Sequence, residues 1–501
     1  MEVGAMKQSQ KIVKNVFAGG LAVGLGGMIQ LAAVALVART VGVSQFGVYS
    51  FILAFAMFFQ LLADSGLCNI LIRELARAPE RLTEILGAAL SLIWLLTAAA
   101  GLLMLAVTPL LHFPLHAKLL TLLMGAATLA QFHAMGYGAV LRAKEEIELH
   151  ALGFFLHKVL FFILIAAAMH MGMALNGVVL AHLIPALFQW GFYRWLVGRA
   201  HGHTRLRMDR ALWKYLLVHS IPVGGATGLR MVSRQIDIFI LTSMRDMRTV
   251  GLFSGPYRMS NMLRFIPATM SLPLYPMYAR LAHGPDGRAA VQLAYVRSVK
   301  YFLIMGLPVT ILFAGFSRVL IDVLLGPNYR EAIVAMEWMG LAFLPFFICD
   351  PLPFLLTALE EQRYLLWSTI AAISTRAALD VALIPLLGYL GPCIAFFVSE
   401  VLLLALLIAR LKRMGFALPV PQLSWRPLVA AGCMVLALWP CRDCALLLAP
   451  LAGAGALAVY ALALWKLGAF DTSEVALARE AGGFLKPFLA KWSRQPQHTP
   501  V

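Results

Sequence analysis

Apolar stretches of about 20 residues alternate with short polar segments along nearly the whole chain. A helix of about 20 apolar residues crosses the hydrocarbon core of a bilayer, and a helix satisfies its own backbone polar groups there. We therefore predict an all-α polytopic membrane protein with about 14 transmembrane helices. The predicted spans are 15–38, 46–67, 85–110, 118–141, 151–171, 174–197, 215–243, 249–278, 298–320, 332–358, 364–386, 389–409, 427–447 and 449–468.

The predicted span 332–358 contains three prolines, Pro345, Pro351 and Pro353. Proline lacks a backbone N–H and its ring clashes with the preceding helical turn. We therefore predict a kinked or broken helix in this span.

Basic residues gather on one side of the predicted spans. Most of the 41 Lys and Arg residues fall in the N-terminus, in alternate loops such as 194–214, 280–300 and 410–426, and in the C-terminal tail. Cytoplasmic loops carry an excess of Lys and Arg. The asymmetry predicts that both termini lie in the cytoplasm.

The chain repeats itself at one offset. Shifted by 204 residues, segment 20–25 aligns with 224–229, and segment 47–50 aligns with 251–254. We interpret these matches as duplicated halves of six spans, related by an axis along the membrane normal; chance matching of Gly and Ala is the alternative. The predicted units are an N-terminal six-helix bundle (1–200), a C-terminal six-helix bundle (201–412), two additional transmembrane helices (413–470) and a cytoplasmic tail (471–501).

Composition excludes a soluble protein. Hydrophobic residues make up 61% of the chain and charged residues 13%, whereas soluble domains have about 25% charged residues. The net charge of +17 comes from short basic clusters between apolar stretches. This arrangement suits membrane topology and anionic lipid headgroups. We expect membrane lipids, and no nucleic acid, as partners.

An enzyme is not predicted. The loops between the predicted spans are too short for a separate catalytic domain, and the sequence has no P-loop pattern. We expect no cofactor. Cys441 and Cys444 have the spacing of half a zinc site, but without a second pair or nearby histidines we expect no metal. Either the two cysteines form a small disulfide or their proximity is incidental.

Several ionisable residues lie within predicted spans. Such residues are costly at membrane depth and usually face a cavity or a partner. Arg230, Arg234 and Asp237 follow i, i+4, i+7 spacing and share one helical face, which we expect to point inward. The other candidates are Lys158, Arg258, Arg264, Asp350, Arg376, Asp380 and Glu400.

We interpret the cations as lining a hydrated cavity between the halves that accepts a phosphorylated or acidic solute. Arginine suits this role because its planar fork binds phosphate in a bidentate manner and stays charged. The predicted substrate-binding residues are Arg230, Arg234, Arg258, Arg264, Lys158 and Arg376. The predicted ion-coupling or ion-pair residues are Asp237, Asp350, Asp380 and Glu400. The alternative is structural: Arg234 with Asp237, and Arg376 with Asp380, would be ion pairs that lock helices together.

Several segments resemble one known family. They are 36–50, 64–67 and 72–74 in the first half, and 237–241, 250–254 and 272–276 in the second. Their order and spacing are similar to those of bacterial polysaccharide flippases, the oligosaccharidyl-lipid branch of a superfamily that also contains multidrug-extrusion transporters and lipid II flippases. The resemblance covers about residues 10–410.

The resemblance implies two six-helix bundles around a central cavity that work by alternating access in the bacterial cytoplasmic (inner) membrane. The implied substrate is an undecaprenyl-diphosphate-linked oligosaccharide, flipped to the periplasmic leaflet for surface polysaccharide biosynthesis. Implied partners are a polysaccharide polymerase and chain-length machinery. The alternatives are a cation-coupled multidrug extruder, for which Asp350, Asp380 and Glu400 would matter more than the arginines, a lipid II flippase, and a membrane glycan polymerase or ligase.

Overall fold

The computed structural model describes residues 2–202, 204–271, 273–282, 284, 287–441 and 448–470. The side chains of residues 1–23 and of Pro222, Val223, Ala226, Thr227 and Arg230 lie outside the described part. All the regular elements within the described ranges are helices, as predicted. Cys444 lies outside these ranges, so the suggested Cys441–Cys444 disulfide does too.

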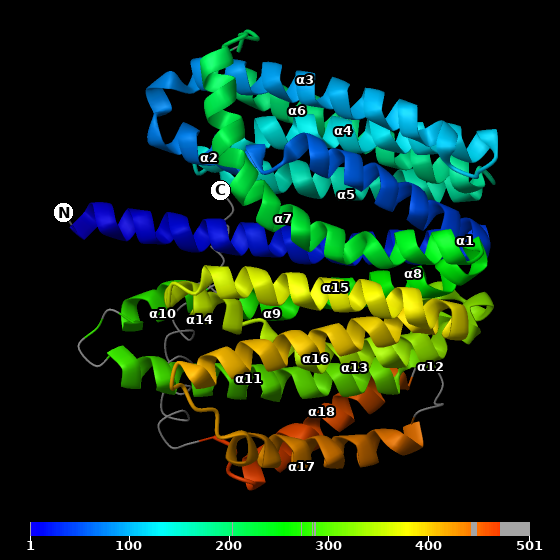
Figure 1. The fold of residues 1–501 in the computed structure, drawn as a ribbon, viewed down its shortest axis with the longest axis vertical. Helices are drawn as coiled ribbons and strands as arrows, with labels where there is room; N and C mark the ends of the chain where they lie inside the picture. Colours follow the sequence, from blue (N-terminus) through cyan, green and yellow to red (C-terminus); the bar gives the residue numbers. More distant parts are fainter. Residues whose placement is uncertain are drawn as a thin grey trace, which may run out of the picture.

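The first half contains six helices (Figure 1). They are α1 (Glu2–Asp64), α2 (Leu67–Arg77), α3 (Leu82–Val107), α4 (Leu115–Ala143), α5 (Ile147–His170) and α6 (Ala174–His201). Gly42 interrupts α1 with a φ of 76°, a backbone conformation that glycine adopts without steric cost. The chain reverses there, so α1 supplies two antiparallel segments, matching the predicted spans 15–38 and 46–67.

The second half begins with α7 (Arg210–Met244), which connects the two halves. Leu216 of α7 is buried in an apolar core with Leu86 of α3, whereas Leu241 belongs to a core that also contains Phe347 of the second half. The following helices are α8 (Met247–Leu263), α9 (Phe265–Ser271), α10 (Leu274–Ala282), α11 (Gly287–Gly315), α12 (Ser317–Leu320), α13 (Ile333–Cys349), α14 (Leu352–Ala358), α15 (Gln362–Leu387) and α16 (Leu390–Arg413).

Two helices of the second half are broken. The break predicted in 332–358 is confirmed, because α13 ends at Cys349 and α14 begins at Leu352. A continuous helix over 249–278 was also predicted, and that prediction is wrong, since three helices occupy the segment. Pro267 lacks the N–H that would bond the carbonyl of Leu263, so α8 ends there. Pro273 marks the start of the next helix in the same way.

Helices α17 (Val420–Leu438) and α18 (Ala449–Lys466) follow and pack against α11. Their shared core contains Leu303 and Leu307 of α11 with Met434 of α17 and Tyr460 of α18. The hydroxyl of Tyr460 donates to the carbonyl of Ile304 at 2.9 Å. The last two helices are therefore fastened to the second half of the chain.

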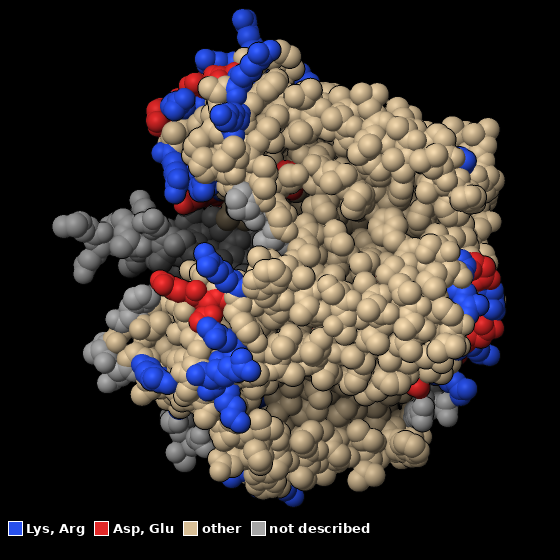
Figure 2. All heavy atoms as spheres, in the orientation of Figure 1, with Lys and Arg blue, Asp and Glu red and all other residues tan. Residues whose placement is uncertain are grey.

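The helices form a multi-pass membrane protein. In the described part of the chain, eleven helices are long and apolar enough to cross a bilayer, with both segments of α1 counted in one. Figure 2 shows charged side chains at the two ends of these helices, with a broad uncharged band between them. That band has the place of the lipid-facing surface. The count of about 14 spans stays a prediction.

Helix bounds and backbone contacts agree with the predicted internal repeat. The second segment of α1 begins at Val43, and α8 begins at Met247, which follows it by 204 residues. A Cβ on Gly47 would lie 1.9 Å from the carbonyl oxygen of Met247, and a Cβ on Gly251 would lie 2.0 Å from that of Val43. The contact is reciprocal between equivalent residues, as in a two-fold interface.

Candidate functional site

Two groups of polar side chains lie within the helices. The first, which we call the cationic site, consists of Lys158, Arg258, Gln30, Tyr49 and His182. Lys158 of α5 donates a hydrogen bond from Nζ to Oε1 of Gln30 in α1 at 2.9 Å. The same Nζ lies 5.4 Å from the ring centroid of Phe154. Among the described residues, this lysine thus contacts an amide and an aromatic ring.

Arg258 extends from α8 of the second half to α1 of the first half. Its Nη2 donates to Oγ of Ser50 at 3.4 Å, and its Cζ lies 4.8 Å from the ring centroid of Tyr49. Nε of Arg258 is buried and has no hydrogen-bond partner among the described residues. Oη of Tyr49 lies 3.0 Å from Nε2 of His182, which is within electrostatic range of both Lys158 and Arg258. This chain of contacts places two cations at the junction of the halves.

The second group, which we call the mixed-charge site, consists of Arg264, Arg376, Asp237, Asp350, Asp380 and Glu400. Arg376 of α15 donates from Nε to Oδ1 of Asp237 in α7 at 2.7 Å, and from Nη2 to Oδ2. Their side chains are 4% and 0% exposed. A buried, bidentate pair of this kind joins the two helices, and removal of either partner leaves an uncompensated charge.

This pairing differs from the one suggested by sequence spacing. Asp237 faces α15 and bonds Arg376, whereas the side chain of Arg234, one turn earlier on α7, is exposed. Asp380 has a fully buried side chain, and both of its carboxylate oxygens lack a hydrogen-bond partner among the described residues. Together, Arg376, Asp237 and Asp380 carry one net negative charge when both carboxylates are ionised.

Aromatic rings and carboxyl groups complete the mixed-charge site. Cζ of Arg264 lies 5.2 Å from the ring centroid of Phe396, and Cζ of Arg376 lies 4.6 Å from it. Glu400 is within electrostatic range of both arginines. Asp350, at the break between α13 and α14, accepts a hydrogen bond from Oγ of Ser271 at the end of α9. Both broken helices of the second half thus meet at this site.

The four substrate-binding arginines predicted between residues 230 and 264 do not form one group. Arg258 joins Lys158, and Arg264 joins the mixed-charge site. Arg234 contributes its carbonyl, which accepts the hydroxyl of Tyr257 at 2.7 Å, and its side chain is within electrostatic range of Arg264. The side chain of Arg230 lies outside the described part of the chain.

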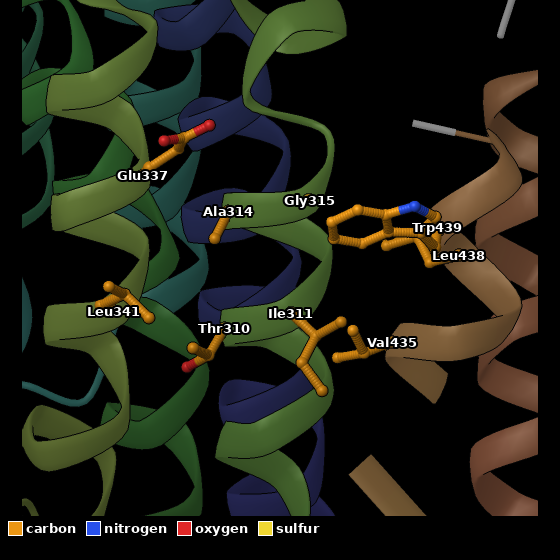
Figure 3. A pocket seen from close by; sticks show the side chains of 9 residues that line it. All are labelled: Thr310, Ile311, Ala314, Gly315, Glu337, Leu341, Val435, Leu438 and Trp439. Atoms are coloured by element: carbon orange, nitrogen blue, oxygen red, sulfur yellow. The ribbon is translucent and has the colours of Figure 1, made fainter. Parts of the chain in front are cut away.

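Sequence reasoning missed Glu337, which lies inside the predicted span 332–358. Its side chain lines a cavity of about 290 Å³ between α11, α13 and α17, with Trp439 on the opposite wall (Figure 3). Oγ of Ser317 donates to Oε1 of Glu337 at 3.3 Å. An acidic residue within an apolar window is the signal that identifies it.

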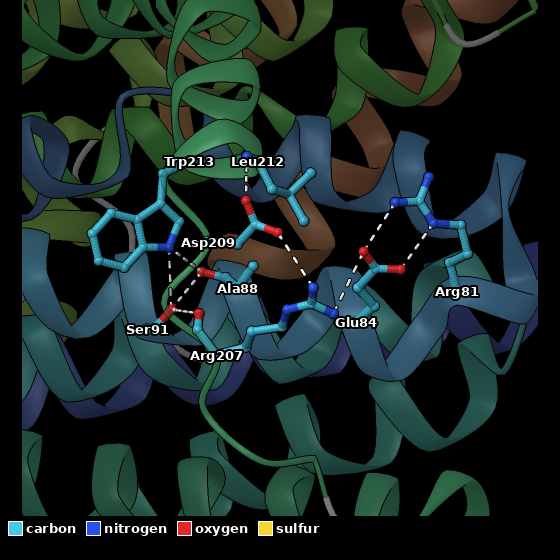
Figure 4. A network of polar contacts seen from close by, with 8 residues as sticks. All are labelled: Arg81, Glu84, Ala88, Ser91, Arg207, Asp209, Leu212 and Trp213. Atoms are coloured by element: carbon cyan, nitrogen blue, oxygen red, sulfur yellow. Dashed lines mark hydrogen bonds and ion pairs between the residues drawn. The ribbon is translucent and has the colours of Figure 1, made fainter.

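Sequence reasoning also missed how the segment between the two halves is held (Figure 4). Oγ of Ser91 in α3 donates to the carbonyl of Arg207 at 2.6 Å, and Nε1 of Trp213 donates to Oγ of Ser91 at 3.1 Å. Oδ1 of Asp209 accepts the N–H of Leu212 at 3.0 Å and caps α7. The segment that enters α7 is thereby fixed to the first half.

An apolar groove of about 630 Å³ lies beside the junction of α8 and α9. Its walls are carbon side chains of α8, α9, α11, the segment after α12, and α18, among them Leu263, Ile266, Phe313 and Leu457. Leu263 immediately precedes Arg264 in the chain. The groove therefore borders the junction of α8 and α9, where Arg264 lies in the chain.

Comparison with known proteins agrees with this architecture. The structure is similar to "Lipid II flippase MurJ, inward closed conformation", with a TM-score of 0.70 and 13% identity over 90% of this chain and 98% of that chain. It is also similar to an inward-facing multidrug resistance MATE family transporter of the MOP superfamily, with a TM-score of 0.61 and 16% identity over 80% and 95% of the two chains. A MOP superfamily transporter from Pyrococcus furiosus, described as having a binding pocket of reverse polarity, gives a TM-score of 0.54 at 16% identity over 81% and 97%.

These similarities establish the transporter fold of the MOP superfamily. A search of curated protein sequences gives no match. The family model described as "Polysaccharide biosynthesis protein" matches residues 12–282, more than half of the chain. The two solved structures compared above are described as a lipid II flippase and a multidrug transporter. The chain therefore belongs to the polysaccharide biosynthesis protein family.

Proposed function

We propose that the protein flips an undecaprenyl-diphosphate-linked oligosaccharide from the cytoplasmic to the periplasmic leaflet of the bacterial cytoplasmic membrane, for surface polysaccharide biosynthesis. Membership of the polysaccharide biosynthesis family and likeness to a lipid II flippase support this substrate class. Both termini lie in the cytoplasm, as the distribution of Lys and Arg indicates.

The observation that carries the proposal is the cationic site. Lys158 and Arg258 contact an amide, a hydroxyl group and aromatic rings, none of which carries a negative charge. A cation held among neutral groups at membrane depth is stabilised by an anion that joins it. A diphosphate supplies two phosphate groups, and Arg258 retains a buried N–H that can donate to one of them.

The apolar groove supplies the place for the polyprenyl chain of the substrate. Its walls are carbon side chains of α8, α9, α11 and α18, a surface that suits a polyprenyl chain. The other predicted substrate-binding residues have different roles in this proposal. Arg264, Arg234 and Arg230 assist the diphosphate or acidic sugars, whereas Arg376 has Asp237 as its partner.

Alternating access requires the halves to separate at one end at a time. At one end, Gly47 and Gly251 hold α1 against α8. The α1–α8 contact keeps the halves together at this end. A polysaccharide polymerase and chain-length machinery would receive the product in the periplasm.

The test uses purified protein in proteoliposomes with a fluorescent polyprenyl-diphosphate disaccharide. Wild-type protein is expected to expose the probe to an added quencher on the opposite leaflet, and Lys158→Gln/Arg258→Gln is expected to abolish this exchange. Lys412→Gln/Arg413→Gln removes two exposed cations from the end of α16 and serves as the control. Equal exchange by wild type and the Lys158/Arg258 variant would refute the role of the cationic site.

A second candidate function, cation-coupled multidrug extrusion, is favoured by the four carboxyl groups of the mixed-charge site. A cationic drug would bind Asp350, Asp380 or Glu400 rather than the arginines. Efflux of a cationic dye that depends on Asp380 and not on Arg258 would select this function over lipid flipping. If the protein flipped lipid II at least as fast as other lipid-linked glycans, the lipid II alternative would be selected.

A further inference from the structure

A basic cavity lies away from both sites, between α11 and α17. Its volume is about 350 Å³, within the range of about 300–1,000 Å³ found for small-molecule pockets. Arg297 and Lys300 of α11 and Gln422 and Arg426 of α17 supply its polar groups, and carbon side chains such as Leu423 supply the rest. We call it the basic cavity.

The walls of the basic cavity are held in place by hydrogen bonds. Nη2 of Arg288 donates to the carbonyl of Met414 at 2.7 Å, and Oε1 of Gln292 accepts the N–H of Ala417 at 3.0 Å. These bonds fix the segment that precedes α17 onto α11. Arg426 donates from Nη1 to the carbonyl of Gly468, which fixes the end of α18 as well. The cavity is therefore part of the folded structure.

The charges of the basic cavity favour the binding of an anion. Nε of Arg426 is buried and has no hydrogen-bond partner among the described residues. Arg297 and Arg426 line the same cavity, and like charges in one cavity repel each other. A phosphate group between them would accept hydrogen bonds from both guanidinium groups and remove this repulsion.

The position of the basic cavity selects a lipid as the source of that phosphate. It lies at the end of α11 and α17 that carries the predicted cytoplasmic loops, where Figure 2 shows basic side chains gathered. Trp425, beside it, is 47% exposed, and Leu428 and Val429 on the next turn of α17 are 50% and 47% exposed. An exposed Trp above exposed apolar residues is typical of a helix that enters lipid at that level.

We propose that the basic cavity binds the headgroup of an anionic phospholipid, whose acyl chains lie along the exposed apolar face of α17. The bound lipid bridges α11 and α17 and so stabilises the attachment of the last two helices to the second half. This site is separate from the cationic site, and its occupancy does not depend on which glycan is carried.

The test measures lipid binding to the purified full-length protein in a neutral detergent. Native mass spectrometry is expected to detect one tightly held phosphatidylglycerol, and the thermal unfolding midpoint is expected to rise with phosphatidylglycerol but not with phosphatidylcholine. Arg297→Gln/Arg426→Gln is expected to weaken phosphatidylglycerol binding about twenty-fivefold, since each cation near an anionic lipid contributes roughly a fivefold gain. Arg297→Lys/Arg426→Lys should keep most of the affinity, which separates loss of charge from loss of fold.

The matched control is Lys412→Gln/Arg413→Gln, which removes two exposed cations from the same end of the second half without touching the cavity. It should bind phosphatidylglycerol as wild type does. Three results would overturn the proposal. They are unchanged binding by Arg297→Gln/Arg426→Gln, equal stabilisation by inorganic phosphate, which would indicate a soluble anion, and a wild type that binds no phosphatidylglycerol.

Discussion

The two polar sites differ in how their cations are balanced. In the mixed-charge site, Arg376 is fully buried and forms a bidentate pair with Asp237. In the cationic site, Lys158 and Arg258 contact an amide, a hydroxyl group and aromatic rings. Arg376 thus has a carboxylate partner within the protein, whereas the described contacts of Lys158 and Arg258 include no carboxylate. The difference teaches that ionisable residues in membrane spans do not share one role, and that the identity of the partner separates structure from binding.

The two kinds of site should differ in how much stability is lost when one residue is replaced. A buried ion pair contributes little net stability, yet loss of one partner is costly because the other charge remains buried. When a cation lies among neutral groups, its removal leaves no opposite charge buried without a partner. Such a removal should therefore change stability little. Stability measurements should therefore respond to one site, and transport measurements to the other.

The largest effect is expected for Asp237→Asn. This change leaves the Arg376 guanidinium buried without its carboxylate, and the free energy of unfolding should fall by about 3–5 kcal/mol. The measurement is the thermal unfolding midpoint of the purified protein in detergent. The double variant Asp237→Leu/Arg376→Met should recover most of the loss, because no stranded charge remains. A single variant as stable as wild type would mean that Asp380 takes over the pairing.

Arg258→Gln comes next and should affect transport instead. Loss of a charged hydrogen-bond donor to phosphate costs about 1.5–3 kcal/mol, which corresponds to a flipping rate about ten- to hundredfold lower. The unfolding free energy should change by less than about 2 kcal/mol, since the guanidinium group of Arg258 lies mainly against aromatic rings. Arg258→Lys should keep part of the rate, because the charge remains and the planar fork does not. The proteoliposome exchange experiment measures the rate.

The sequence predicted the helical membrane fold because lipid imposes a simple requirement on it. A span needs a long apolar window, and such windows are visible without knowledge of neighbours. The broken helix at Pro351 followed from proline chemistry in the same way. The break at Arg264 was not predicted, although Pro267 supplies the same chemistry, since the surrounding apolar window concealed it.

The partners of the ionisable residues could not be predicted in the same way. Asp237 and Arg376 are 139 residues apart, and their pairing depends on how α7 packs against α15. The suggested Arg234–Asp237 pair relied on helical spacing alone. Spacing identifies neighbours on the same helix and gives no information about residues on other helices. Arg258 was assigned to the second half by its position in the chain, and only packing brings it to Ser50 and Tyr49 of the first half.

The backbone contact between α1 and α8 leaves no room for a side chain at Gly47 or Gly251. Gly47→Ala and Gly251→Ala each place a methyl group against a carbonyl oxygen of the other half, and each should cost about 1–3 kcal/mol of unfolding free energy. Because the two contacts are equivalent, the two single variants should be similarly destabilised. The double variant should lose less than the sum, since α1 and α8 are already separated by the first methyl group. Strict additivity in thermal unfolding would show that the two contacts are independent.

The smallest effect is expected for Glu84→Gln. This variant tests a carboxylate–arginine pair that is exposed to water, for comparison with the buried pair of Asp237 and Arg376. Glu84 precedes the predicted span 85–110 and accepts hydrogen bonds from Nε and Nη2 of Arg81 at 3.0 Å and 3.1 Å, a bidentate pair like that of Asp237 and Arg376. Water solvates both groups there, so removal of the charge strands nothing, and thermal unfolding should be unchanged within error. If Glu84→Gln proved as damaging as Asp237→Asn, the pairing itself would matter, and burial would not be what distinguishes the two sites.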